Sequence, residues 1–257
     1  MVTRPVAQTT ALLQQLNELG ATPIVFPCIE IIAVDCTNEL AALPVELNQI
    51  DLFIFISSNA VQHAFAQIPH IHQPATPNTA FASIGQATAQ KLHELGVAQV
   101  IAPDQGFDSE SLLALPAMSN LQDKTTLIVK GAGGRTKLID TLRSRGAAAY
   151  SLDVYRRQIP TEPNLEALQS APDVILFSSS ESVENMLKII PAHQHHRVLH
   201  SQTITGHARI AAKVTSLGFE KLPIIAANPS DQAILTALKG WENRTENHNE
   251  QQGRNGT

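Results

Sequence analysis

The sequence predicts an α/β fold of two similar domains, each a parallel sheet flanked by helices, with a two-stranded linker joining them. Three observations predict it: short β-prone apolar runs alternate with segments of helical period, several helical segments end on glycine, and the pattern repeats once along the chain. Strands that alternate with helices form parallel sheets, because a connection between parallel strands needs a crossover that covers one face of the sheet.

Eight short runs, rich in β-branched and aromatic residues, are expected to be strands. They are residues 24–26, 52–56, 81–84, 100–102, 125–129, 174–177, 203–205 and 224–226. Apolar residues spaced three or four apart predict helices between them, most clearly over residues 12–19, 138–142 and 183–190. Glycine at the end of a helix favours the left-handed turn that stops it. We expect this role for Gly20, Gly96, Gly146 and Gly218.

An internal repeat predicts the domain organisation. Residues 51–61, DLFIFISSNAV, return 122 positions later as DVILFSSSESV, and residues 12–30 resemble residues 138–156. Along the chain a short unit, residues 12–30, is followed by a long unit that begins at residue 51. The same order then repeats, with a short unit at residues 138–156 and a long unit that begins at residue 173. We therefore expect one domain over residues 35–152 and a discontinuous domain over 1–27 plus 159–242. Residues 28–34 and 153–158 are then the inter-domain crossovers.

Composition excludes several classes of protein. The chain carries 18 basic and 23 acidic residues, a net charge of −5 with no basic stripe, so nucleic-acid binding is not expected. No apolar run approaches the roughly 20 residues that span a bilayer, and the start does not read as a signal peptide. Two cysteines cannot make a disulfide framework, so we expect a cytoplasmic protein. Residues 243–257 contain no apolar side chain and are expected to be disordered.

Short polar residues, serines and one asparagine, follow two equivalent strands and open the next helices. They are Ser57, Ser58 and Asn59 in one copy of the repeat and Ser179 and Ser180 in the other. Ligands bind at the carboxyl edge of parallel sheets, and helix N-termini favour anions, so these residues are candidate substrate contacts. The alternative is that they only cap their helices.

Three further features of the sequence could carry chemistry, and two of them have two interpretations. The loop from Lys130 to Arg135, KGAGGR, lacks the spacing of a phosphate loop and is either an anion-contacting loop or a plain turn. The histidines near residues 70 and 195 lie in polar segments without metal-ligand spacing, so no metal is expected. Tyr155 lies in the second crossover, where its phenol either donates a proton to a bound substrate or packs at the domain junction.

A set of short motifs, in this order, covers about residues 2–238. They are VTRP at 2–5, FISSNAV at 55–61, IGxxTA at 84–89, SExLL at 109–113, GRxxL at 134–138, VYRR at 154–157, FSSS at 177–180 and PSD at 229–231. The ordered set resembles the uroporphyrinogen-III synthase family. Two positions depart from the family pattern: Lys130 stands where many members have arginine, and Ala208-Arg209 where some have threonines.

The resemblance implies a lyase that removes water from the linear tetrapyrrole hydroxymethylbilane and closes it with the last ring inverted, giving uroporphyrinogen III. It implies no metal or organic cofactor, and we expect a monomer. The substrate is expected between the domains, its carboxylates held by main-chain N–H groups and hydroxyls. By position, Tyr155 matches the tyrosine that assists loss of the hydroxyl. The substrate contacts matched by position are Ser58, Thr88, Ser180, Arg4 and Arg135.

Residues considered without the resemblance add Ser57, Asn59, Ser179 and Lys130 to the candidate substrate contacts. They also leave an alternative function open. Two similar α/β lobes with two crossovers suit a non-catalytic ligand-binding module that closes on its ligand. The start of the chain and the few cysteines count against an exported module of this kind.

Overall fold

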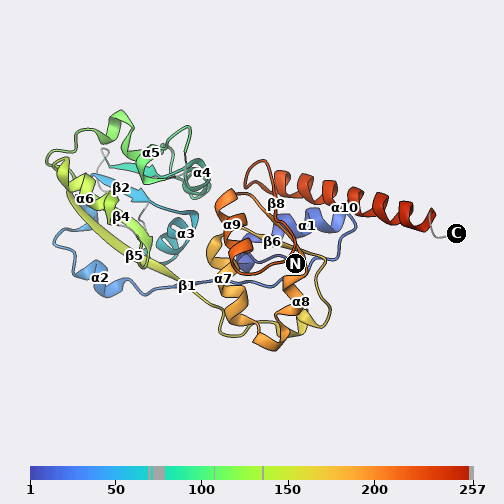
Figure 1. The fold of residues 1–257 in the computed structure, drawn as a ribbon. Helices are drawn as coiled ribbons and strands as arrows, with labels where there is room; N and C mark the ends of the chain where they lie inside the picture. Colours follow the sequence, from blue (N-terminus) through green and yellow to red (C-terminus); the bar gives the residue numbers. More distant parts are fainter. Residues whose placement is uncertain (69–70, 72–78, 107, 135, 255–257) are drawn as a thin grey trace. The chain divides into compact units, whose positions relative to one another are not determined.

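The computed structural model describes residues 1–68, 71, 79–106, 108–134 and 136–254, with side chains up to residue 245. The chain divides into two compact units (Figure 1). The central unit is Ile31–Arg157, and the terminal unit combines Met1–Glu30 with Gln158–Thr257. Both boundaries fall inside the two crossover segments that the repeat predicts.

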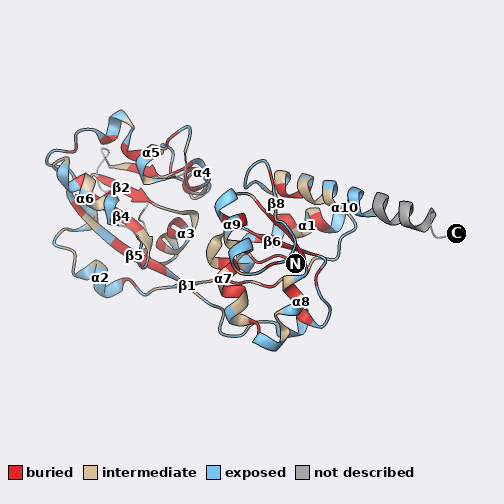
Figure 2. Cartoon of the chain, viewed as in Figure 1, coloured by how far each residue is buried: buried red, intermediate tan, exposed pale blue. Residues whose placement is uncertain are grey.

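The central unit is built on a five-stranded sheet. In sheet order its strands are β1 (Glu30–Ala33), β5 (Ala148–Gln158), β4 (Thr125–Gly131), β2 (Leu52–Phe55) and β3 (Ala80–Ser83). The pairs β5–β4, β4–β2 and β2–β3 are parallel, as predicted. All four residues of β2 are buried, because helices cover both faces of the sheet (Figure 2).

Alternate residues of β2 enter two separate cores. Phe53 and Phe55 pack with α2 (Thr37–Ala41), α3 (Ser58–Gln67) and α4 (Gln86–Glu94) on one face. Ile54 packs with α5 (Ser109–Leu113) and α6 (Lys137–Ser144) on the other. This alternation follows from the two-residue period of a strand.

The terminal unit contains the parallel strands β6 (Val174–Phe177), β7 (Gln202–Thr205) and β8 (Ile224–Ile225). Val2 extends this sheet through isolated parallel bridges to Leu176 and Val25. One face is covered by α7 (Ser180–Ile189), α8 (His196–Leu199) and α9 (Ala208–Ser216). The other face is covered by α1 (Thr10–Glu18) and α10 (Asp231–Arg254).

The predicted repeat is present in the structure. Strands β2 and β6, helices α3 and α7, strands β3 and β7, and helices α4 and α9 each have the same length and begin 122 positions apart. The four glycines expected at helix ends all have positive φ: 79° at Gly20, 94° at Gly96, 92° at Gly146 and 86° at Gly218. Each half of the fold therefore uses the same local signals.

Two expectations differ from the structure. Residues 24–26 and 100–102 contribute only isolated bridges, at Val25 and Ile101, instead of full strands. The crossovers, by contrast, are parts of β1 and β5, in agreement with the two-stranded linker that the sequence predicts. Helix α10 continues to Arg254, whereas the sequence predicts disorder from residue 243. Once packed residues such as Ile234 have nucleated the helix, each further residue adds a backbone hydrogen bond, so the stretch extends although asparagines and Gly253 lower its helix propensity. None of the described helices is long and apolar enough to cross a membrane.

Candidate active site

Tyr155 lies on an irregular part of β5. The β4–β5 register pairs Lys130 with Asp153 but Gly131 with Tyr155, so Val154 is an extra residue. Successive strand residues normally face opposite sides, yet Val154 and Tyr155 enter the same core, the one that α3 covers. The bulge therefore turns the tyrosine toward α3.

The phenol of Tyr155 contacts residues from two elements, helix α3 with its N-cap and strand β4. Its oxygen lies 3.1 Å from Ser57 Oγ, and its ring stacks on His63 with centroids 5.7 Å apart and planes 22° apart. The opposite strand contributes Gly131, where a Cβ atom would lie 2.5 Å from the ring. The Tyr155 side chain is only 3% exposed, so its position is fixed by packing.

Ser57 is the N-cap residue of α3. Its backbone is extended, and its Oγ accepts a hydrogen bond from the Ala60 N–H at 3.0 Å. Ser58 Oγ donates to the Ala87 carbonyl at 3.3 Å, which ties the start of α3 to the start of α4. Asn59 lies in the first turn of α3 and is half-buried.

Thr88 lies in the first turn of α4, next to Ala87, and is buried. Helices α3 and α4 follow β2 and β3, so both N-termini lie at the carboxyl edge of the same parallel sheet. The structure thus brings four predicted site residues together in the central unit: Ser57, Ser58, Thr88 and Tyr155. A helix N-terminus carries a partial positive charge and unsatisfied N–H groups, which favour a carboxylate.

Three predicted site residues belong to the terminal unit. Ser179 caps α7 and accepts from the Ser182 N–H at 3.0 Å. Ser180 follows it, and its Oγ is buried with no hydrogen-bond partner among the described residues. Arg4 follows the Val2 strand segment and forms an ion pair with Asp231 at the start of α10.

Lys130, a predicted cationic contact in the central unit, also has an ion-pair partner. Lys130 Nζ lies 2.6 Å from Asp153 Oδ1 and donates to the Gly133 carbonyl at 3.0 Å. It therefore holds the loop after β4 against β5, and its charge is largely neutralised. Arg135 lies outside the described residues.

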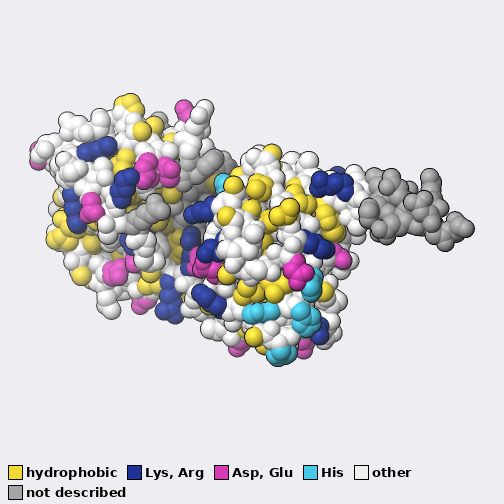
Figure 3. All heavy atoms as spheres, viewed as in Figure 1, with side chains coloured by type: hydrophobic (Ala, Val, Ile, Leu, Met, Phe, Trp, Pro, Cys, Tyr) yellow, Lys and Arg dark blue, Asp and Glu magenta, His cyan; other side chains and the backbone are white. Residues whose placement is uncertain are grey.

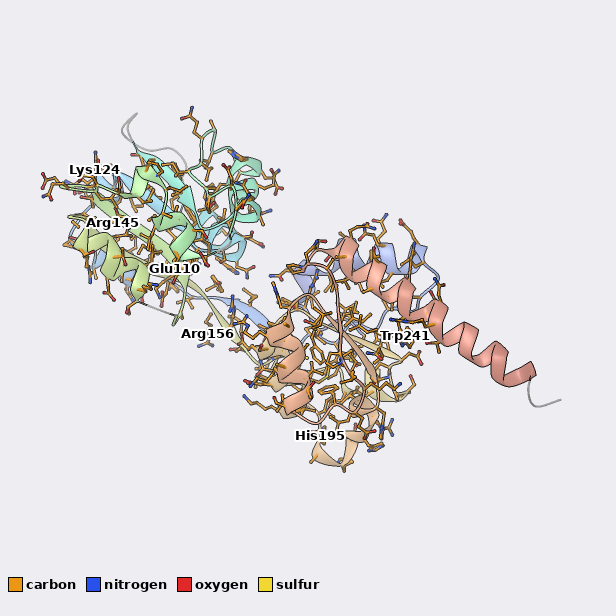
Figure 4. All side chains as sticks on the ribbon, turned by 45° about the horizontal axis from the view of Figure 1, so that its top comes forward. Glu110, Lys124, Arg145, Arg156, His195 and Trp241 are labelled. Atoms are coloured by element: carbon orange, nitrogen blue, oxygen red, sulfur yellow. The ribbon has the colours of Figure 1, made fainter. Side chains whose placement is uncertain are left out.

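The histidines near residue 195 have structural partners. Figure 3 shows them gathered on the surface over α8. His195, labelled in Figure 4, lies within 3.0 Å of the Leu187 and Ile190 carbonyls through Nε2. His200 Nδ1 lies 2.6 Å from the carboxylate of Glu220. His70 and His72 lie outside the described residues.

Both cysteines are free and buried, and burial raises the pKa of each thiol. The Cys28 and Cys36 thiols therefore stay protonated and unreactive at neutral pH.

Sequence patterns did not single out His63, and they marked Gly131 only as part of the loop from Lys130 to Arg135. His63 and Gln67 are spaced by four residues on α3, and both reach β5: Gln67 Nε2 donates to the Val154 carbonyl at 3.0 Å. This polar pair on a mostly apolar face is the available signal for His63. Burial lowers the pKa of His63, so the imidazole that stacks on Tyr155 is neutral at pH 7.

The fold and these residues define a class of protein: two-domain α/β proteins that place hydroxyl-capped helix N-termini at the carboxyl edges of parallel sheets. Within that class, a family model described as "Uroporphyrinogen-III synthase HemD" matches residues 10–236. The chain belongs to the uroporphyrinogen-III synthase family. It therefore has the catalytic role of a hydro-lyase in tetrapyrrole biosynthesis, and the alternative of a non-catalytic binding module is set aside.

Relatives along nearly the whole length support this assignment. The uroporphyrinogen-III synthase of Escherichia coli (strain K12) is 32% identical over 249 residues, which cover 93% of this chain and 99% of that protein. The enzyme of Salmonella typhimurium (strain LT2) is 29% identical over 246 residues, covering 93% and 99%. The resemblance found in the sequence motifs is confirmed.

Solved structures show the same fold. Uroporphyrinogen-III synthetase from Helicobacter pylori 26695 superposes with a TM-score of 0.58 at 16% identity, covering 84% of this chain and 92% of that one. A mutant uroporphyrinogen III synthase from the extremely thermophilic bacterium Thermus thermophilus gives 0.57 at 17% identity, covering 96% and 98%.

Proposed function

We propose that this protein converts hydroxymethylbilane to uroporphyrinogen III by dehydrative cyclisation with inversion of the last pyrrole ring. The observation that carries the proposal is the family match over residues 10–236. The reaction is a dehydration and ring closure without electron transfer. Acid–base groups and positioning are therefore sufficient chemistry for it.

Carboxylate recognition is proposed to rest mainly on neutral donors. The N-termini of α3, α4 and α7 present N–H groups beside the hydroxyls of Ser58, Thr88 and Ser180. Arg4 and Lys130 each form an ion pair with an aspartate, so they add little net positive charge. Neutral donors at helix N-termini suit a polyanionic substrate and an acidic protein. Asn59, Ser179 and Arg135 remain candidate contacts on their sequence positions alone.

Tyr155 is proposed to assist departure of the hydroxyl group. A pyrrole methanol that loses water becomes an electrophilic azafulvene, which closes unaided to the uninverted isomer. The protein's main task is then to present the substituted carbon of the last ring first, through a spiro intermediate. Holding the chain in that geometry supplies the selectivity, and the hydroxyl pair of Tyr155 and Ser57 supplies the proton.

We also propose a monomer that works in a reducing cytoplasm without nucleic-acid or membrane partners. The buried free thiols and the net charge of −5 support this setting. Each unit has its own two-layered core, and the large exposed apolar residues are scattered singly along the chain.

The proposal is tested by product analysis. The purified protein is incubated with freshly generated hydroxymethylbilane, and the products are oxidised to porphyrins and separated by isomer. We expect the inverted isomer to dominate, and the uninverted isomer to dominate with heat-denatured protein. A mixture that matches the denatured control would refute the proposed function.

A further inference from the structure

Among the residues that the structure describes, Ser57 Oγ has two hydrogen-bond partners and one hydrogen-bonding position without a partner. A serine hydroxyl has one donor hydrogen and two acceptor lone pairs. One lone pair of Ser57 Oγ accepts from the Ala60 N–H at 3.0 Å, and the Tyr155 phenol lies 3.1 Å away. The Tyr155 side chain is buried, whereas Ser57 is half-buried at the carboxyl end of β2. Of the two hydroxyls, Ser57 is thus the one better placed to meet a bound molecule.

The acidities of the Tyr155 and Ser57 hydroxyls indicate which of the two donates the hydrogen bond between them. A phenol, with a pKa of about 10, is a stronger acid and a better donor than an alcohol. When Tyr155 donates to Ser57 Oγ, both serine lone pairs are used and the serine proton is left over for another acceptor. We propose that Ser57 hands its proton to the departing hydroxyl of the substrate and that Tyr155 replaces that proton. This relay rests on the proposed function.

The step balances without a further reactant. The carbon–oxygen bond of the pyrrole methanol breaks, its electron pair leaves with the oxygen, and the Ser57 proton completes a water molecule. The Tyr155 proton moves to Ser57 Oγ, so that an azafulvenium cation and a phenolate remain. Ring closure releases a proton from the attacked pyrrole, and this proton restores the phenol. Serine and tyrosine therefore end in their starting states.

The surroundings favour this charge distribution. Ser57 caps a ten-residue helix, and the positive end of the helix dipole stabilises negative charge beside its first turn. The phenol ring is held between Gly131 and His63, which keeps its oxygen at Ser57. Preorganised groups of this kind need no rearrangement when charge develops.

The internal repeat supplies a matched control. Ser179 caps α7 as Ser57 caps α3, with an equal 3.0 Å bond to the N–H three residues on. At the shift of 126 that relates the short units, residues 12–30 and 138–156, the position of Tyr155 corresponds to Ile29. The terminal unit thus has the capping serine without a phenol at the matching position. A comparison of Ser57→Ala with Ser179→Ala therefore separates the effect of losing a helix cap from the effect of losing the proton relay.

The test uses the full chain and hydroxymethylbilane. The variants are Ser57→Ala, Tyr155→Phe, the double variant, Ser57→Thr, Ser57→Asp and Ser179→Ala. For each we measure kcat, KM, the solvent deuterium isotope effect on kcat, and Tm. Ser57→Thr retains the hydroxyl, whereas Ser57→Asp retains the cap but has no proton to give when ionised.

We expect Ser57→Ala, Ser57→Asp and Tyr155→Phe to lower kcat by similar factors, up to about 10²–10⁴, with little change in KM. The double variant should be no slower than the slower single variant, because the two groups act in one step. The isotope effect should show two transferring protons in the parent and fewer in Tyr155→Phe. Ser57→Thr should restore most of kcat. Ser179→Ala should lower Tm or raise KM and leave the isotope effect on kcat unchanged.

Normal kcat in Ser57→Ala with a slow Tyr155→Phe would overturn the relay and make Tyr155 the direct donor. Multiplicative losses in the double variant would likewise overturn it, since they mean independent roles. In both cases the parent still forms the inverted isomer, so the proposed function stands. A parent that forms only the uninverted isomer would remove the proposed function itself.

Discussion

Gly131 and Tyr155 lie so close across strands β4 and β5 that a Cβ atom on the glycine would be 2.5 Å from Cζ of the tyrosine ring. The bulge at Val154 creates this approach by turning the ring toward β4 and α3. The Ala132 N–H also donates to the Tyr155 carbonyl at 2.7 Å, which fixes the backbone at the same point. The position of the phenol therefore depends on the missing side chain at residue 131.

Gly131→Ala should displace the ring and separate the phenol from Ser57. We expect kcat to fall toward the value of Tyr155→Phe, with a lower Tm, because the contact is far shorter than any real Cβ contact. Steady-state kinetics and thermal unfolding measure both effects. Gly240→Ala is the control: a Cβ there meets nothing within 4 Å, and alanine favours the helix. Parent-like turnover in Gly131→Ala would show that the ring position is not needed.

Tyr155→Phe should slow turnover but keep the isomer ratio. General acid help is worth about 10²–10⁴-fold, so the loss is moderate. The ratio of isomers depends on how the substrate chain is held rather than on the proton donor. Isomer analysis beside the measured rate separates the two properties. An unchanged rate would remove Tyr155 from the reaction, and a reversed isomer ratio would make it a positioning residue.

Local sequence patterns predicted the structural features that depend only on residues close together in the chain. Short-range rules account for the strands around residues 52–56 and 174–177, for the serines that cap the helices after them, and for the glycines that end helices. Because the sequence repeats at a shift of 122 positions, the same prediction applied to both units. The same patterns placed Ser57 and Ser58 correctly at the start of α3.

Contacts between residues far apart in the chain could not be predicted from the sequence. The bulge at Val154 depends on the register between two strands, and alternation alone would put Tyr155 on the face opposite to α3. The partners of Arg4 and Lys130 are also set by tertiary structure: Asp231 is 227 residues from Arg4 in the chain. A cation in a sequence motif therefore does not reveal whether its charge is free for a ligand.

Substrate affinity should be spread over several weak contacts. We expect Ser58→Ala and Thr88→Val each to weaken substrate binding by about 0.5–1.5 kcal/mol, as for ordinary neutral hydrogen bonds. Valine preserves the shape of the buried threonine, so the change isolates the hydroxyl. KM and the affinity of a non-reacting linear tetrapyrrole report the effect, with Ser216→Ala as an exposed-hydroxyl control. Complete loss of turnover with an intact fold would identify a catalytic group instead.

Ser180→Ala should stabilise the fold while it weakens substrate binding. Its Oγ is buried with no hydrogen-bond partner in the described part of the chain, and such a group costs about 1–3 kcal/mol. We therefore expect a rise of about 1 kcal/mol in the free energy of unfolding, measured with urea. Ser182→Ala is the control on the same helix, because Ser182 Oγ donates to the Ser179 carbonyl at 2.7 Å and its loss should destabilise. A less stable Ser180→Ala would mean that the hydroxyl is already satisfied in solution.

His63 should make stability depend on pH below neutrality. Burial lowers its pKa in the folded protein below the ordinary value of 6.5, so the unfolded chain takes up the proton first as the pH falls. Above pH 6.5 the imidazole is neutral in both states and contributes nothing to the pH dependence. Below pH 6.5 the unfolded state gains free energy that the folded state lacks, so stability falls until the folded pKa is reached.

The measurement compares urea unfolding of the parent and His63→Gln at about pH 7 and about pH 5, on either side of the ordinary histidine pKa. Glutamine does not titrate, so the variant should lose less stability than the parent between the two values. Loss of the ring stack on Tyr155 lowers its stability by a similar amount at both. His196→Gln, at an exposed position on α8, is the control and should follow the parent. If the difference between the parent and His63→Gln is the same at both pH values, the stacked imidazole accepts a proton as readily as in water, and its burial does not keep it neutral beside the phenol.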